Sequence, residues 1–171
     1  GTTAIALSNE DYTAAARILC KFAESHENFK VKSGFLDGKV VDVATLTGAV
    51  LIALGTEITG VLSNNDEFYN ELLVAARRSG EKFWRLPNDK CFKKLYKGDF
   101  ADLKNTGGRY GGTITAGMFI EEFVQDKPWL HLDIAGTSWT DGGNDTTPKG
   151  GTGAPVATLY ELVVKHKCKH K

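Results

Sequence analysis

The residue types best suited to catalysis gather in the second half of the chain, where a histidine and an aspartate stand two positions apart. The string from Trp129 to Asp133 alternates apolar and polar residues, which predicts a strand with His131 and Asp133 on one face. A histidine beside a carboxylate resembles a general base with the group that orients it. Side chains two apart on one strand are parallel neighbours rather than donor and acceptor, and no G-x-S-x-G string accompanies them. The pair therefore favours a structural role.

A glycine-rich loop precedes a predicted helix. From Gly107 to Gly112, glycines bracket Arg109 and Tyr110, so the backbone can reach positive φ. From Thr113, a candidate N-cap, apolar residues recur at helical spacing. Such a helix N-terminus can cradle an anion, but neither the Walker nor the Rossmann string occurs, and a tight turn that seats a core helix is the commoner explanation. Arg109 either binds an anion here or pairs with an acid such as Asp102.

Two further groups carry residue types that bind metals or transfer protons. Asp99 and Asp102 flank the glycine loop as possible paired carboxylates, although solvated acids on loops are far commoner. His166, Cys168 and His170 alternate with lysines in a short C-terminal tail. Because lysines repel a cation, this tail predicts adventitious metal binding rather than a built site.

The bulk composition describes one globular domain with no strong electrostatic preference. The chain has 171 residues, of which 42% are hydrophobic and 25% charged, so it can bury a core. Lys+Arg and Asp+Glu both number 21, which disfavours nucleic-acid binding. The apolar run from residue 43 to residue 55 is shorter than the roughly 20 residues that a bilayer requires, so no membrane association is expected.

Cysteine usage and the N-terminus predict a cytoplasmic protein. The three cysteines lack C-x-x-C spacing and cannot all pair within one chain, which favours free thiols and a reducing compartment. The N-terminus has neither the basic nor the long apolar region of a secretory signal. It also lacks an initiating methionine, which an artificial boundary, a processed chain or a fragment would each explain.

Strands alternate with helices along the chain, which predicts an α/β fold with a mostly parallel central sheet flanked by helices. The apolar run after Leu46 is assigned to no helix, and the glycine-rich segment from residue 140 to residue 153 is predicted to be a loop. The predicted strands are Ala4–Leu7, Val40–Leu46, Thr59–Leu62, Phe83–Leu86 and Trp129–Ile134. The predicted helices are Glu10–Ser25, Glu67–Ser79, Lys90–Lys97, a segment from Thr113 and Ala154–Lys165.

Four strings, in this order, resemble the C-terminal catalytic domain of the leucine aminopeptidase (cytosol aminopeptidase) family. The resemblance runs from about Lys39 to Val163, whereas residues 1–38 match poorly. It predicts a partial aminopeptidase-like α/β domain over residues 1–165 and a basic tail over residues 166–171. The strings are VVDVATLTG (Val40–Gly48), ADLKNTGGRYGG (Ala101–Gly112), WLHLDIAGTSW (Trp129–Trp139) and PKGGTG (Pro148–Gly153).

The resemblance implies metal-dependent removal of N-terminal residues from peptides. Family members use two divalent ions, zinc or manganese, that activate a water beside the substrate's amino group. Most of the ligands lie upstream of the matching strings, and the last ones belong to the signature N-T-D-A-E-G-R. Aligned here, that signature falls on residues 7–13 and places Asn9, Asp11 and Thr13 where the family has Asp, Glu and Arg. Shifting by one position puts Glu10 on the Glu but restores no arginine.

Asp11 is thus the one candidate metal ligand that the alignment offers, and a weak one. Asparagine is a neutral, weak ligand, aspartate is shorter than glutamate, and threonine cannot replace a guanidinium. We therefore expect this chain to bind no divalent metal and to be inactive on its own.

The substrate-facing side of the family's site matches better. In the family, the turn that contains ATLTG contacts the bound peptide and the turn that contains DIAG lines the pocket for its first side chain. The alternative is that Leu46 is a core residue and that Gly48 serves a turn. The resemblance carries these roles to Thr45, Leu46, Gly48, Ala135 and Ser138.

Two functions remain open from the sequence. The first is the C-terminal part of a metal-dependent leucyl aminopeptidase that acts on peptide N-termini. The second is a non-catalytic, aminopeptidase-like scaffold or assembly subunit. Because family members are typically hexamers, a homo-oligomer or a larger assembly is expected in either case.

Overall fold

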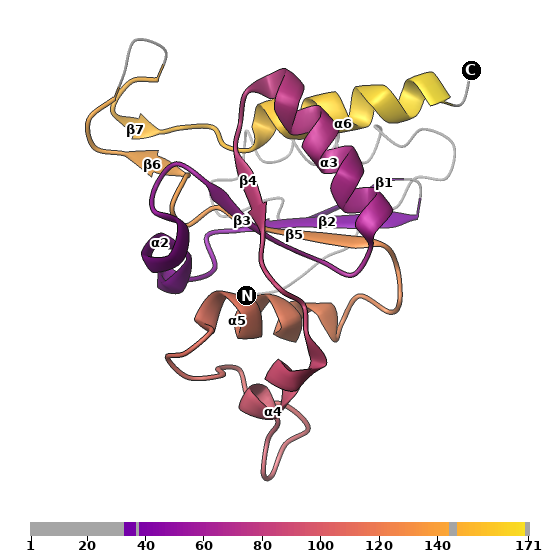
Figure 1. Cartoon of the computed structure of the whole chain (residues 1–171), viewed down its shortest axis with the longest axis vertical. Helices are drawn as coiled ribbons and strands as arrows, with labels where there is room; N and C mark the ends of the chain where they lie inside the picture. The colour runs from indigo at the N-terminus through magenta and orange to yellow at the C-terminus, as the bar shows by residue number, and fades with distance from the viewer. Residues whose placement is uncertain (1–32, 37, 144–146, 170–171) are drawn as a thin grey trace, which may run out of the picture.

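A central sheet with helices on both of its faces organises the computed structural model, which describes residues 33–36, 38–143 and 147–169 (Figure 1). The sheet has five strands in the order β1-β2-β5-β3-β4. β2 and β5 run parallel, as do β3 and β4, whereas β1 is antiparallel to β2 and β3 is antiparallel to β5. The strands are β1 Ser33–Leu36, β2 Lys39–Ala44, β3 Thr59–Ser63, β4 Phe83–Arg85 and β5 Trp129–Asp133.

The helices form a layer on each side of this sheet. In Figure 1, α3 and α6 lie side by side above it and α5 lies below it, with α4 beneath α5. The short α2 stands at one end of the sheet, near the hairpin of β6 (Trp139–Thr140) and β7 (Gly150–Gly151). This arrangement confirms the predicted α/β class. The helices are α2 Gly48–Leu54, α3 Asp66–Ser79, the 3-10 turn η1 Lys90–Phe92, α4 Lys93–Tyr96, α5 Gly112–Glu121 and α6 Val156–Lys169.

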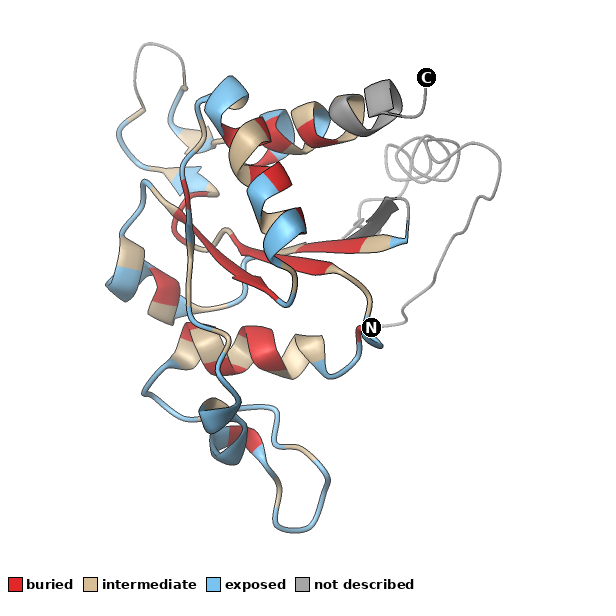
Figure 2. Ribbon diagram, turned by 45° about the vertical axis from the view of Figure 1, so that its right-hand side comes forward, coloured by how far each residue is buried: buried red, intermediate tan, exposed pale blue. Residues whose placement is uncertain are grey.

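Because helices cover both faces, the middle of the sheet is buried on both sides (Figure 2). Along β5, Leu130 and Leu132 belong to the core beneath α3 and α6, whereas Trp129 belongs to the core above α5. The sequence located this strand correctly. Its polar face is nevertheless not solvated, since His131 and Asp133 are both 0% exposed. Buried polar groups of this kind must be hydrogen-bonded, and their partners define the candidate site.

Two helices follow the sequence signals closely. α3 begins after Asn65, whose side chain accepts a hydrogen bond from the Phe68 N–H at 2.8 Å. It ends at Gly80, which has a left-handed backbone with φ 80°. α6 begins after Pro155, two residues later than expected, and continues to Lys169.

The sequence missed α2 and overextended β2. The strand ends at Ala44, and the helix GAVLIAL starts at Gly48 with Thr47 as its N-cap. All seven residues of this helix are apolar or glycine, so no amphipathic period betrays it. Within the described residues, no helix has the length and apolar character needed to cross a membrane. The strand predicted over residues 4–7 and the helix predicted over residues 10–25 lie outside the described ranges.

Three smaller expectations also need correction. Thr113 is not an N-cap, because α5 starts at Gly112 after the left-handed Gly111, whose φ is 62°. The predicted helix from Lys90 to Lys97 is divided between a 3-10 turn and one turn of α-helix. The predicted loop contains a short antiparallel pair, β6 Trp139–Thr140 with β7 Gly150–Gly151.

Candidate functional site

Two turns that matched the family strings meet where β2 and β5 end. The strands are parallel, with Ala44 paired to Asp133, so their carboxyl ends lie at the same edge of the sheet. The Ile134 N–H donates to the Ala44 carbonyl at 3.0 Å, which closes the pair. Ligand sites in α/β folds commonly form at this edge.

The buried Asp133 carboxylate holds both turns. Its Oδ1 accepts from the backbone N–H of Leu46 at 3.1 Å, of Ala135 at 3.2 Å and of Thr47 at 3.4 Å. Its Oδ2 accepts from the Thr47 hydroxyl at 2.6 Å. Four donors therefore surround one carboxylate, which compensates for the burial of its charge. The carboxylate is the shared anchor of the turn after β2 and the turn after β5.

The Thr47 hydroxyl extends this anchor to two helices. Its single proton goes to Asp133, so the oxygen accepts from its other neighbours. These are the Val50 N–H at 3.2 Å, in the first turn of α2, and the Thr113 hydroxyl at 3.1 Å, in α5. Thr113 is therefore the donor in the threonine pair. The chain of bonds Thr113–Thr47–Asp133 joins α5, α2 and β5.

The turn after β5 also packs against the end of α2. A Cβ on Gly136 would lie 2.2 Å from the Gly55 carbonyl oxygen, so only glycine fits there. Further along, the Ser138 N–H donates to the Ile134 carbonyl at 2.9 Å, and the Ser138 carbonyl accepts from Thr152 N–H at 3.0 Å. Ser138 thus lies beyond the Asp133 anchor, at the start of the hairpin.

The structure therefore brings most of the sequence-predicted substrate residues together. Leu46 and Ala135 share an oxygen of Asp133, and Thr45 and Gly48 belong to the same turn and helix start as Leu46. Thr45, Leu46 and Gly48 are exposed, and Ala135 and Ser138 are half-buried. Leu46, at 37% exposed, is not a core residue. We define the substrate wall as Thr45, Leu46, Gly48, Ala135 and Ser138; its contact with peptide stays a prediction.

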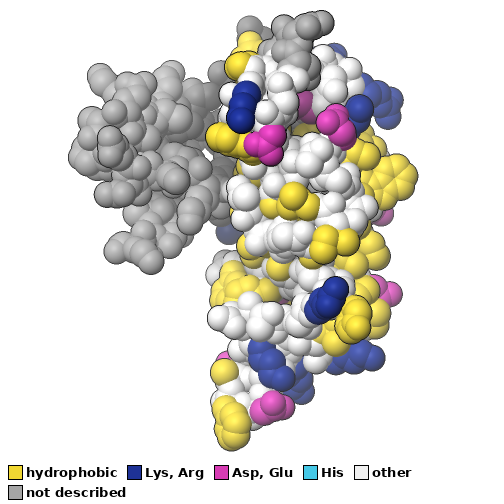
Figure 3. Space-filling model, turned by 90° about the vertical axis from the view of Figure 1, so that its left-hand side faces the viewer, with side chains coloured by type: hydrophobic (Ala, Val, Ile, Leu, Met, Phe, Trp, Pro, Cys, Tyr) yellow, Lys and Arg dark blue, Asp and Glu magenta, His cyan; other side chains and the backbone are white. Residues whose placement is uncertain are grey.

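Figure 3 views the molecule from the side on which α2 and the hairpin lie. Hydrophobic and uncharged atoms predominate at the middle of this face, while charged side chains gather above and below. On α2, Leu51 is 40% and Ile52 88% exposed. The surface beside the wall is therefore apolar, and no described part of the chain covers it.

The hydrogen-bond partner of His131 is a carboxylate on the neighbouring strand, not Asp133. Its Nδ1 lies 2.5 Å from Asp42 on the neighbouring strand, and the same carboxylate accepts from the Trp129 indole N–H at 2.6 Å. Asp42 and His131 are cross-strand partners in the β2–β5 register. The His131 Nε2 is buried and has no hydrogen-bond partner among the described residues. This cluster lies between the sheet and α5, since a Cβ on Gly117 of α5 would lie 3.2 Å from the His131 ring. It fits the expected structural role.

The glycine loop seats α5 rather than forming a charged cradle. A Cβ on Gly107 would lie 2.6 Å from the Thr115 Cβ, and one on Gly112 would lie 3.0 Å from the Ala49 Cβ of α2. Arg109 forms no ion pair with Asp102 or any other acid in the part of the chain that the structure describes. Asp99 lies 3.5 Å from the Lys104 ammonium.

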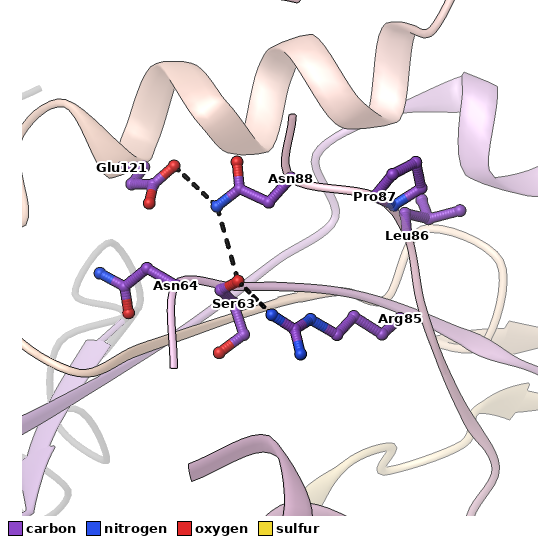
Figure 4. A pocket seen from close by; sticks show the side chains of 7 residues that line it. All are labelled: Ser63, Asn64, Arg85, Leu86, Pro87, Asn88 and Glu121. Atoms are coloured by element: carbon purple, nitrogen blue, oxygen red, sulfur yellow. Dashed lines mark hydrogen bonds between the residues drawn. The ribbon is translucent and has the colours of Figure 1, made fainter. Parts of the chain in front are cut away.

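A separate surface pocket lies at the opposite edge of the sheet (Figure 4). β3 is antiparallel to β5, so the end of β3 at Ser63 is remote from Asp133. The Ser63 carbonyl accepts from Arg85 at 2.9 Å, and Asn88 donates to Glu121 at 2.9 Å. The first bond joins β4 to the end of β3, and the second joins the segment after β4 to α5. The polar groups of the pocket thus bond to one another.

The described residues do not fit a dinuclear metal centre. No three His, Cys, Asp or Glu side chains in the described ranges are grouped as metal ligands would be. The buried carboxylates of Asp133 and Asp42 are occupied by hydrogen bonds from N–H and O–H donors. The candidate ligand Asp11, with its neighbour Glu10, lies outside the described residues.

Sequence reasoning missed Thr47 and Asp42. It gave Thr113 a capping role instead of a bond to Thr47, and it assigned Asp133 no contact with the wall. Thr47 stands inside the ATLTG string, between two residues that were selected. A threonine just before a helix start is an N-cap signal that could have identified it, had α2 been recognised. The other contacts depend on strand register, which no local pattern encodes.

Residues 31–160 match the catalytic domain of the cytosol aminopeptidase family. A probable cytosol aminopeptidase of Clostridium perfringens (strain 13 / Type A) is 55% identical over 131 residues, which cover 77% of this chain and 26% of the relative. Another of Alkaliphilus oremlandii (strain OhILAs) is 51% identical over 125 residues, covering 73% and 25%. The chain spans about a quarter of the length of the curated relatives it matches.

Solved structures agree in fold. A mutant of tomato leucine aminopeptidase superposes with a TM-score of 0.70 and 42% identity, over 75% of this chain and 25% of that chain. The bottromycin maturation enzyme BotP in complex with Mn gives a TM-score of 0.70 and 40% identity, over 74% and 28%. With the catalytic-domain match covering most of its length, this chain belongs to the cytosol aminopeptidase family, whose members are metal-dependent peptidases.

Proposed function

We propose that this chain is the C-terminal, substrate-facing part of a metal-dependent leucyl aminopeptidase and that it is inactive on its own. The single observation that carries the proposal is the Asp133 carboxylate, which binds Leu46 and Ala135 from two turns that both match the family. Those turns would receive the N-terminal residue of a peptide, with Ala135 and Ser138 beside its side chain. Substrate binding is thus the contribution assigned to this chain.

The metal-dependent step is not assigned to the described residues of this chain. When bound, a zinc or manganese pair supplies a water activated for attack on the peptide carbonyl. The described residues offer no site for such a pair, and the aligned positions Asn9, Asp11 and Thr13 lack the family's donors. We infer that this chain binds neither ion as a cofactor.

The partners and location follow the family. We propose that the chain acts on peptide N-termini in the cytoplasm, which the name of its relatives supports, and that it forms a homo-oligomer or a larger assembly. A membrane partner and nucleic acid are not part of the proposal, since Lys+Arg and Asp+Glu balance at 21 each.

The alternative function is a non-catalytic scaffold or assembly subunit. The exposed apolar side chains Leu51 and Ile52 of α2 favour it, because exposed apolar patches commonly mark protein contacts. Under this alternative the wall would keep its fold without receiving a peptide.

Hydrolysis of leucine anilide by the purified chain tests the inactivity. Zinc, manganese and cobalt are titrated in turn, with a chelator control and circular dichroism to show that the chain is folded. We expect no turnover with any metal. Turnover abolished by the chelator would contradict the proposal, and Asp11→Asn and Glu10→Gln would then show which carboxylate was misjudged.

A further inference from the structure

The Asp133 carboxylate is the one described group that is bonded to both turns of the substrate wall. We propose that Asp133 is a positioning residue, which, together with the Thr47 hydroxyl, fixes the backbone of Leu46 and Ala135 for contact with a peptide. The fixing of the backbone stands on the hydrogen bonds alone. Its service to a peptide rests on the proposed function.

The chemistry of the cluster requires an ionised carboxylate. Leu46 N–H, Thr47 N–H, Ala135 N–H and the Thr47 O–H all point protons at Asp133, which is 0% exposed. A carboxylate accepts at both oxygens and donates at neither, so it matches this set. An asparagine would turn an NH₂ group toward one of the donors and would lose the charge that strengthens the rest.

The Thr47 hydroxyl donates to Asp133 and accepts from two other groups. Because Asp133 Oδ2 accepts the single Thr47 proton, the Thr47 oxygen accepts from the Val50 N–H and the Thr113 hydroxyl. Thr47→Val removes all three of these bonds, whereas Thr47→Ser keeps the hydroxyl and loses only a methyl group. The two variants therefore separate these hydrogen bonds from simple packing.

Asp42 is the matched control. It is also a buried carboxylate, on strand β2, and it forms short hydrogen bonds with the Trp129 indole N–H and with His131. It has no bond to either turn of the wall among the described residues. Asp42→Asn therefore perturbs a buried carboxylate of the same sheet without touching the anchor.

Amide hydrogen exchange on the full ¹⁵N-labelled chain is the first measurement. In Asp133→Asn and Thr47→Val we expect the Leu46 and Ala135 amides to exchange about tenfold faster relative to the Val61 amide of β3. Thr47→Ser and Asp42→Asn should leave that ratio within about twofold of the original chain. An unchanged ratio in Asp133→Asn and Thr47→Val, or an equal rise in Asp42→Asn, would overturn the positioning role. If Asp133→Asn does not fold, the Thr47 pair decides.

Leucinamide affinity is the second measurement and addresses the peptide. Asp133→Asn and Thr47→Val should weaken binding about tenfold, with rescue by Thr47→Ser and no loss in Asp42→Asn. If the original chain binds no leucinamide while the exchange ratios change as expected, the proposed function fails and the anchor stands. If leucinamide binds but equally well to every folded variant, the positioning role fails and the proposed function stands.

Discussion

At the scale of single residues, a substitution of Thr113 tests the Thr113–Thr47–Asp133 chain of hydrogen bonds at the end farther from Asp133. Thr113 is 4% exposed and donates to Thr47 at 3.1 Å. Thr113→Val should lower the free energy of unfolding by about 1 kcal/mol, because one buried hydrogen bond is lost and Thr47 keeps an unfilled acceptor. Urea unfolding followed by circular dichroism measures this.

Thr113→Ser serves as its control, since serine retains the hydroxyl. It should keep the hydrogen bond to Thr47 and lose only the packing of one methyl group, which has a modest effect on the free energy of unfolding. Equal destabilisation by the valine and serine variants would show that Thr113 contributes packing rather than a hydrogen bond.

The sequence predicted the location of the wall but not its anchor. Leu46 and Ala135 were selected from matching strings, and the parallel pairing of their strands brings them to one edge. From the sequence, Asp133 can be compared only with near neighbours such as His131, two positions away, because a sequence displays local spacing alone. Its partners Leu46 and Thr47 lie 87 and 86 positions away, and only the β2–β5 register joins them.

At the scale of elements, Gly136 sets how closely the turn after β5 approaches α2. A Cβ there would lie 2.2 Å from the Gly55 carbonyl oxygen at the end of α2. Gly136→Ala should therefore destabilise the chain by about 1–3 kcal/mol, because backbone must move to relieve the contact. Thermal or urea unfolding provides the measurement.

Gly142→Ala is the matched substitution in open space. Apart from Gly142 and its chain neighbours, no heavy atom of the described residues lies within 4 Å of the Cβ position, and the backbone φ is not positive. It should change stability by about 0.5 kcal/mol or less. If Gly136→Ala were equally neutral, the close approach of turn and helix would be wrong.

The contact between α4 and α5 gives a pH dependence. The Lys93 ammonium, 2.6 Å from Glu122, lowers the pKa of that carboxyl below its ordinary value of 4.5, and the Tyr96 hydroxyl adds a bond at 3.1 Å. A lowered folded pKa means that the contribution to stability is present above pH 4.5 and is lost as pH falls through the folded pKa.

Stability measured from pH 6 down to about pH 3 should therefore decline more steeply in the original chain than in Glu122→Gln. The difference should be about 1 kcal/mol or less, because the pair is partly exposed. Parallel curves for the two chains would contradict a stabilising role for the ionised Glu122.

Elements with a clear period were predictable and the others were not. α3 has an amphipathic face, an asparagine cap and a terminal glycine, and its predicted and observed bounds nearly agree. α2 lacks a polar face, so no amphipathic period marks its apolar residues as a helix. α5 begins at glycines, where tertiary contact with α2 rather than a side-chain cap sets the start.

At the scale of the whole molecule, the sheet separates two surfaces. The wall lies where β2 and β5 end, and the polar pocket around Ser63 and Asn88 lies at the opposite edge. The apolar surface of α2 adjoins the wall and is uncovered by the described residues. We therefore assign the proposed peptide contact to the end of the sheet where β2 and β5 end.

The central claim is that the wall receives a peptide N-terminus without a metal centre in the chain. Chemical-shift mapping of the ¹⁵N-labelled chain with leucinamide, in the presence of a chelator, tests it most directly. We expect shifts concentrated at Leu46, Gly48 and Ala135, with none at the Asn88 pocket. Binding that shifts only the pocket, or a folded chain with no shifts at any concentration, would contradict the account and favour the scaffold.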